Sequence, residues 1–316
     1  MSETLLPVLY GLLVWWFSTG VALYVVGMTG EKPRSTLIGA TLLFLGSLAT
    51  LIATRNDPGV GGAYIAFTAA IGVWGAQEIA FLTGWITGSW RAPCPPAARG
   101  FERLGYAVRA ILHHELALAA SGLAVFAATW GGDNQTGAWT FAVLFAMRIS
   151  AKLNVFLGVP NLTENFLPAH LAYLKSFFAR RPMNLLMPVS VTVSTVALVL
   201  LVQGASSADG AAATSLVFLA TLVALGLLEH WFLVLPLPVE ALWTWGLASR
   251  DARVAALAAA SVTAESVPPL SAKVVRLEAH PAMRGLAAPL SRPTHLRAGT
   301  DARLTATRTD HAGGRP

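Results

Sequence analysis

Apolar residues recur along this chain in seven long runs, which shorter polar segments separate. Each run is about as long as the roughly 20 helical residues that cross a bilayer core about 30 Å thick. The pattern therefore predicts an all-α fold, a polytopic transmembrane helical bundle with about seven spans. The expected spans are residues 5–28, 36–54, 64–88, 105–128, 137–157, 184–203 and 213–235.

Basic residues alternate between the connections. The first loop carries two Lys or Arg residues, and the third and fifth loops carry three each, whereas Arg55 is the basic residue of the even-numbered loops. Because positively charged loops are retained in the cytoplasm, we expect a periplasmic N-terminus and a cytoplasmic C-terminus in a bacterial inner membrane, either cytoplasmic or intracytoplasmic. The first run has no basic start and no small-residue cleavage site, so we expect it to remain in the mature protein.

The fifth loop contains a further helical pattern, which begins at Pro168. Proline is favoured in the first turn of a helix, and Leu167, Leu171, Leu174 and Phe178 would share one helix face. With basic residues beside this apolar stripe, the segment is typical of a helix lying in the cytoplasmic interface of the bilayer.

The charge balance divides the chain into two parts. Residues 1–248 hold 12 Lys and Arg against 11 Asp and Glu, whereas residues 249–316 hold 10 against 5 and have no Phe, Trp or Tyr. We expect a seven-span domain over residues 1–248 and a basic, mostly disordered cytoplasmic tail over 249–316. The overall charged content of 12% does not suit a water-soluble enzyme. Basic residues facing lipid headgroups explain the tail without a nucleic-acid partner.

Ionisable residues inside the expected spans are the candidates for function, since each is costly in hydrocarbon unless it is paired or hydrated. At 1.5 Å per residue, those of four spans fall within about one helical turn of the same depth on the cytoplasmic side. They form a buried polar layer of Glu78, His113, His114, Glu115, Arg148, Lys152, Glu229 and His230.

Three interpretations of this layer remain open. Arg148 and Lys152 can neutralise the carboxylates while the histidines form hydrogen bonds across helices. A divalent metal is a second possibility, with Glu78, His114, Glu115, Glu229 and His230 as ligands, although adjacent Glu and His point about 100° apart. A tetrapyrrole contact is the third, because a membrane histidine can serve as an axial ligand.

Other polar groups surround the cytoplasmic end of the fifth span. Asn154, Asn161, Glu164 and His170 are possible contacts there, although polar residues at a helix exit are commonly solvated caps. The single cysteine, Cys94, excludes an internal disulfide. No complete nucleotide-binding or nucleophilic catalytic motif is present, so the residues do not predict an enzyme.

Several stretches together resemble the photosynthetic complex assembly protein 2 family of purple bacteria, whose members are encoded near the reaction-centre H subunit. They begin at Trp74 (WGAQEIAFLTG), His113 (HHEL), Lys152 (KLNVFLGVPNL), Phe166 (FLPAHLAYL) and Leu228 (LEHWF). The resemblance covers about residues 5–248 and leaves out the tail.

This resemblance implies a membrane-embedded factor that helps to assemble the photosynthetic reaction centre and antenna, or that regulates their bacteriochlorophyll supply. The implied partners are the lipid bilayer, reaction-centre or antenna subunits, and bacteriochlorophyll or a precursor. It does not imply a known reaction, and it leaves the cofactor unknown, with the divalent metal and the tetrapyrrole contact both open. The alternative from the residues is a membrane metalloenzyme that acts on a hydrophobic tetrapyrrole-type substrate through the Glu/His site.

Overall fold

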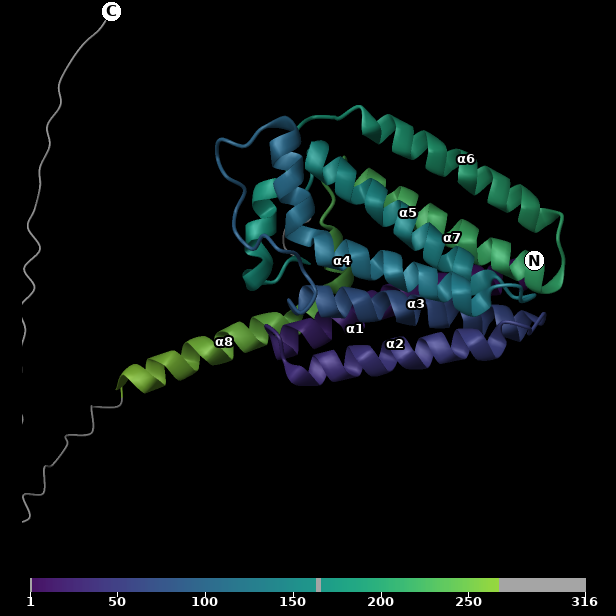
Figure 1. The fold of residues 1–316 in the computed structure, drawn as a ribbon, viewed down its shortest axis with the longest axis horizontal. Coiled ribbons are helices and arrows are strands. Elements are labelled where there is room, and N and C mark those ends of the chain that lie inside the picture. Colours follow the sequence, from purple (N-terminus) through teal and green to yellow (C-terminus); the bar gives the residue numbers. More distant parts are fainter. Residues whose placement is uncertain (1, 163–165, 267–316) are drawn as a thin grey trace, which may run out of the picture. The chain divides into compact units, whose positions relative to one another are not determined.

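The computed structural model describes residues 2–162 and 166–266, and the regular structure of this part is helical (Figure 1). Seven of its helices are long and apolar enough to cross a membrane, which confirms the expected number of spans. These seven are α1 (Ser2–Thr29), α2 (Arg34–Thr54), α3 (Val60–Leu82), α4 (Gly100–Thr129), α5 (Thr136–Leu157), α6 (Leu186–Ser206) and α7 (Gly210–Phe232).

The centre of the bundle is formed by α3 and α7. About half of the residues in the most apolar stretch of each of these helices are buried. Phe67 of α3 and Phe218 of α7 are fully buried, and their rings stack at a centroid distance of 4.2 Å. In contrast, α2 and α6 pack mainly on one neighbour each, α3 and α7 respectively, and leave apolar side chains exposed on their other sides (Figure 1). Such exposed apolar helix faces suit contact with lipid.

The loops gather at two ends of the bundle. At one end the backbone N–H of Lys32 donates to Thr83 O at 2.8 Å, and the backbone N–H of Asn161 donates to Leu233 O at 3.0 Å. At the other end the backbone N–H of Asn134 donates to Arg55 O at 2.8 Å. The basic connections therefore come together at one end, as every second connection between successive spans must.

The helical segment expected in the fifth loop is the 3₁₀ helix η2 (Ala169–Phe177). It buries Leu171, Leu174 and Phe177, which are three residues apart, against Phe81 and Ala110. Because a 3₁₀ helix repeats every three residues, Phe177 takes the buried position that the α-helical pattern gave to Phe178. The apolar stripe thus packs on α3 and α4.

Two further elements follow α7, the 3₁₀ helix η3 (Val239–Trp243) and α8 (Thr244–Ser266). The residues of α8 pack closely on α1, since a Cβ atom on Gly20 would overlap the Trp245 ring and one on Gly27 would overlap the hydroxyl of Ser249. The expected domain boundary at residue 248 therefore falls inside a helix that continues to Ser266. The remainder of the expected tail, and Glu164, lie outside the described residues.

Candidate functional site

The site is built around a contact between α4 and the loop that precedes it. The backbone N–H of His114 donates to Thr87 O at 2.9 Å, and that of Trp90 donates to Arg109 O at 3.2 Å. Gly88 allows this approach, because a Cβ atom there would overlap the carbonyl oxygens of Arg109 and Ala110. Hydrogen bonds from outside disturb the ladder of a helix, and Figure 1 shows α4 bent between its two halves.

His114 lies at this contact and is 1% exposed. Its ring stacks on Phe81 at a centroid distance of 4.3 Å, and its Nε2 lies 4.0 Å from Oε1 of Glu78. Neither ring nitrogen has a hydrogen-bond partner within the described part of the chain. A buried imidazole with both nitrogens unpaired is unusual, and it retains the capacity to bind a polar group.

Charged side chains from four helices join beside His114. Arg148 of α5 places Nε 3.7 Å from Oε1 of Glu78 on α3 and one terminal nitrogen 3.5 Å from Oε1 of Glu229 on α7. One turn further along α5, Lys152 pairs with Glu115 of α4 at 2.5 Å. The ion-pair interpretation of the polar layer therefore has direct geometric support.

The charges of this layer do not balance. Three carboxylates (Glu78, Glu115 and Glu229) face two cations (Arg148 and Lys152), so one negative charge remains when His114 is neutral. Arg148 and Glu229 are 39% and 45% exposed, so this excess charge is only partly buried. The layer therefore joins α3, α4, α5 and α7 through ion pairs and carries one excess negative charge.

His230 belongs to a separate, uncharged network. It is 1% exposed, its Nδ1 lies 2.7 Å from Gly226 O, and its Nε2 lies 2.8 Å from the hydroxyl of Ser150. The Ser150 hydroxyl also lies 2.9 Å from that of Ser190, to which the side-chain amide of Asn154 donates at 3.0 Å. These hydrogen bonds connect α5, α6 and α7 through uncharged side chains.

The remaining candidate residues are dispersed. His113 is exposed on α4 and points away from its buried neighbour His114. The Asn161 amide donates to the carbonyls of Phe232 and Leu235 at 2.8 Å each, and so caps the end of α7. The Nε2–H of His170 donates to Leu82 O at 3.0 Å, which attaches η2 to the end of α3. Asn161 and His170 thus attach the loop between α5 and α6 to the ends of α7 and α3.

Metal ligation has little geometric support. Within residues 2–162 and 166–266, no group of three or more His, Cys, Asp or Glu side chains is placed to hold a metal ion. His114 and Glu78 are adjacent, but Glu115 is paired with Lys152, and His230 is engaged with Ser150. The candidates for one metal centre are therefore divided between two networks.

The sequence pattern missed several polar members of these networks. Gln77 and Thr87 each have a buried oxygen without a partner in the described chain, as does Asn154, which the sequence had indicated as a possible contact. Ser150 and Ser190 form the centre of the neutral network. Their hydroxyls gave no signal, because serine is tolerated in apolar helices by bonding to its own backbone. The i, i+4 spacing of Ser150 and Asn154 was the clue available.

Comparison with known proteins gives two matches. A family model described as "Protein of unknown function (DUF3623)" matches residues 1–254. A relative from Rhodobacter capsulatus, named "Uncharacterized 30.4 kDa protein in puhA 5'region", is 42% identical over 255 residues, which cover 79% of this chain and 93% of the relative. No solved structure matches.

Proposed function

Since the chain belongs to the DUF3623 family, we propose that it is a membrane-embedded factor for assembling the photosynthetic reaction centre and antenna, or for supplying their bacteriochlorophyll. One observation carries this proposal, namely the name of the relative, which places that protein in the region upstream of puhA, the reaction-centre H gene. The similarity extends over nearly the whole relative, so the seven-span domain is the shared part.

The fold supports a role in which the protein contacts other membrane proteins. Along α6, Val193, Val196 and Leu200 are more than half exposed, and α2 has a similar apolar outer side. Lipid or the transmembrane helices of pigment-binding subunits can cover such faces. Meanwhile the internal ion pairs hold α3, α4, α5 and α7 in fixed positions, as a docking scaffold requires.

The alternative function is a membrane metalloenzyme acting on a tetrapyrrole-type substrate. The observation in its favour is His114, whose unpaired nitrogens lie beside Glu78. Elemental analysis of protein purified without chelators distinguishes the two functions. Stoichiometric iron, zinc or manganese that is lost in His114→Ala would favour the enzyme over the assembly factor.

A deletion strain tests the assembly role. Removing the gene should lower the absorbance of assembled reaction centre or antenna complexes, or change pigment accumulation, while growth by respiration continues. Expression of the wild-type gene should restore the absorbance, and an empty vector should not. Unchanged absorbance bands and complex yields in the deletion strain would refute the proposal.

Co-purification gives a second test. Protein extracted in mild detergent should retain reaction-centre or antenna polypeptides, or bacteriochlorophyll or a precursor, as the assembly role requires. A matched extraction of another polytopic inner-membrane protein controls for adventitious pigment. Equal recovery from both proteins would count against a specific complex.

The orientation forms part of the proposal. The basic connections lie at one end of the bundle, and the positive-inside rule assigns that end to the cytoplasm of a bacterial inner membrane. The N-terminus would then face the periplasm and the C-terminus the cytoplasm. His170 and the loop of Cys94 would both lie on the cytoplasmic side.

A further inference from the structure

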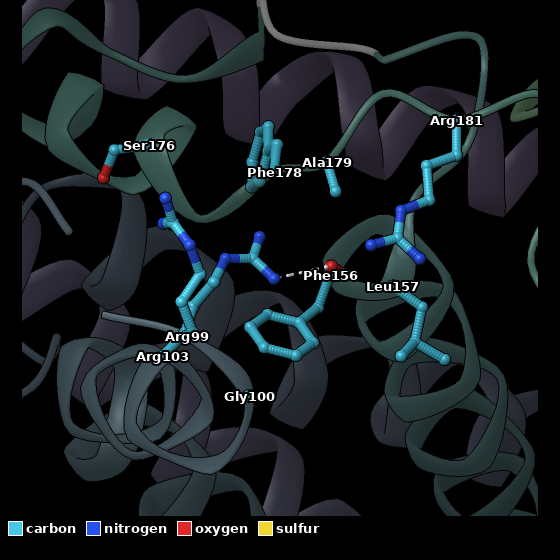
Figure 2. A pocket seen from close by; sticks show the side chains of 9 residues that line it. All are labelled: Arg99, Gly100, Arg103, Phe156, Leu157, Ser176, Phe178, Ala179 and Arg181. Carbon is cyan, nitrogen blue, oxygen red and sulfur yellow. Dashed lines mark hydrogen bonds between the residues drawn. The ribbon is translucent and has the colours of Figure 1, made fainter. Parts of the chain in front are cut away.

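A cavity of about 410 Å³ opens at the basic end of the bundle, outside the polar layer. Its walls come from the start of α4, the end of α5 and the segment that follows η2 (Figure 2). Arg99, Arg103 and Arg181 line it together with Phe156, Leu157 and Phe178. Figure 2 shows Arg99 and Arg103 on one side of the space and Arg181 on the other.

The three guanidinium groups have no carboxylate partner in the part of the chain that the structure describes. Arg103 is fixed by hydrogen bonds to the carbonyls of Phe156 at 3.2 Å and Phe177 at 2.6 Å, and it lies 4.2 Å from the centre of the Phe156 ring. Arg99 donates from one terminal nitrogen to Pro96 O and Ala98 O. Each guanidinium has five N–H donors, so donors remain available on all three.

Three like charges around one cavity repel each other, and an anion placed between them would relieve that repulsion. Gly100 also lines the cavity, so the positive end of the α4 dipole adds to the attraction for an anion. The one acidic residue in the first turn of α4, Glu102, is exposed and does not line the cavity. Arginine groups in this arrangement are typical of phosphate recognition.

The surroundings of the cavity are apolar enough for an acyl chain. Phe101, directly after Gly100, is 91% exposed, and Leu185, four residues after Arg181, is 93% exposed. Exposed Phe and Leu beside basic residues are typical of segments at the boundary between headgroups and acyl chains. A ligand with both a phosphate and an apolar tail would therefore contact both the arginines and the apolar side chains.

We propose that this cavity binds the phosphate headgroup of an anionic phospholipid. The arginines would hold the phosphate oxygens, while Phe156, Leu157 and Phe178 would contact the glycerol and the first methylene groups. A lipid in this position would bridge α4, α5 and the segment after η2. The site is independent of the assembly role.

Native mass spectrometry of the full chain in mild detergent tests the proposal by titration with phosphatidylglycerol and, separately, phosphatidylcholine. Wild-type protein should bind phosphatidylglycerol more tightly. Arg181→Gln is the main variant, because the Arg181 side chain makes no hydrogen bond or ion pair within the described residues. Combined with Arg99→Gln, it should weaken phosphatidylglycerol binding by about tenfold or more, since charge-assisted hydrogen bonds are lost.

A matched control removes two cations from the same end outside the cavity, by Arg91→Gln with Lys175→Gln. Its binding should stay within about twofold of wild type, as expected for screened surface charges. Equal losses in the two double variants, or no preference for phosphatidylglycerol in the wild type, would overturn the site. Inorganic phosphate that raises the melting temperature as much as the lipid does would show a site for a free anion and refute the lipid assignment. Circular dichroism confirms that each variant is folded.

Discussion

Lys152 on α5 places its ammonium nitrogen 2.5 Å from Oε1 of Glu115 on α4. The two side chains are only 25% and 21% exposed, so bulk water screens them poorly. This pair joins two spans that otherwise meet mainly through apolar side chains, and its neighbour Arg148 extends the connection to α3 and α7. Loss of one partner should therefore affect the stability of the bundle more than loss of an exposed charge.

We predict that Glu115→Gln destabilises the bundle by about 3 to 5 kcal/mol, because the Lys152 ammonium is left without its counter-charge. Reversible unfolding in mixed micelles measures this change. Glu102→Gln is the control, since Glu102 is an exposed carboxylate on the same helix without an ion pair to any described residue. The double variant Glu115→Gln/Lys152→Met should recover part of the loss, and equal stability of the two single variants would contradict the prediction.

Gly88→Ala should destabilise the protein by about 1 to 3 kcal/mol, as overpacking of a tight site does. The added Cβ atom would overlap the carbonyl oxygens of Arg109 and Ala110 and separate the loop from α4. Gly105→Ala is the matched control, because a Cβ atom there meets no atom within 4 Å and alanine favours the helix by about 0.5 to 1 kcal/mol. In thermal unfolding in detergent, the melting temperature should be highest for Gly105→Ala, intermediate for the wild type and lowest for Gly88→Ala.

The stability of the protein should fall in acid through His170. Burial lowers the pKa of this imidazole below its ordinary value of 6.5, although the nearby Glu31 carboxylate opposes the shift. The unfolded chain then binds a proton at a higher pH than the folded chain does, so the stabilisation is present above pH 6.5 and is lost as pH falls toward the folded pKa.

Melting temperatures between pH 7.5 and 5.5 measure this dependence. His170→Gln keeps a side-chain N–H for Leu82 O but has no titrating group, so its melting temperature should vary less over the same interval. Parallel pH profiles for the two proteins would show that other groups cause the acid sensitivity.

Cys94 reports the orientation of the bundle. Its loop belongs to the basic end, where the Cys94 N–H donates to the Ser176 hydroxyl at 2.8 Å. A membrane-impermeant maleimide should therefore label Cys94 in lysed spheroplasts and leave it unlabelled in intact ones. Cys94→Ser with Ser207→Cys moves the thiol to an exposed position at the other end and should reverse the pattern. Labelling of Cys94 in intact spheroplasts would invert the proposed topology.

The spans were predictable because length and apolarity alone determine a membrane crossing. Depth along the spans was enough to group Glu78, Arg148 and Glu229, and Arg148 lies within 4 Å of both carboxylates. Depth says nothing about rotation around a helix axis, however. His113 and His114 are equally deep, yet one is exposed and the other is buried, because adjacent residues point about 100° apart.

Contacts that depend on loops were beyond the sequence pattern. The expected third span continued to Gly88, but α3 ends at Leu82 and the following residues turn back to bind α4. The Gly-Trp-Ile-Thr-Gly segment is apolar enough to resemble a span, and only the bonds of Thr87 and Trp90 with α4 distinguish it. The sequence pattern likewise identifies Arg99, Arg103 and Arg181 only as basic residues of loops. The cavity that they share appears only when α4 and α5 are placed together.

The packing of η3 and α8 on α1 sets a condition on how the protein is made. Trp16 donates from its indole to Leu242 O at 2.8 Å, and the indole of Trp243 donates to Trp16 O at 2.9 Å. More than 220 residues of chain separate these partners. A ribosome therefore delivers α1 to the membrane long before η3 and α8 are made. Until translation has passed residue 250, the glycine-lined surface of α1 must contact lipid or an insertion chaperone instead.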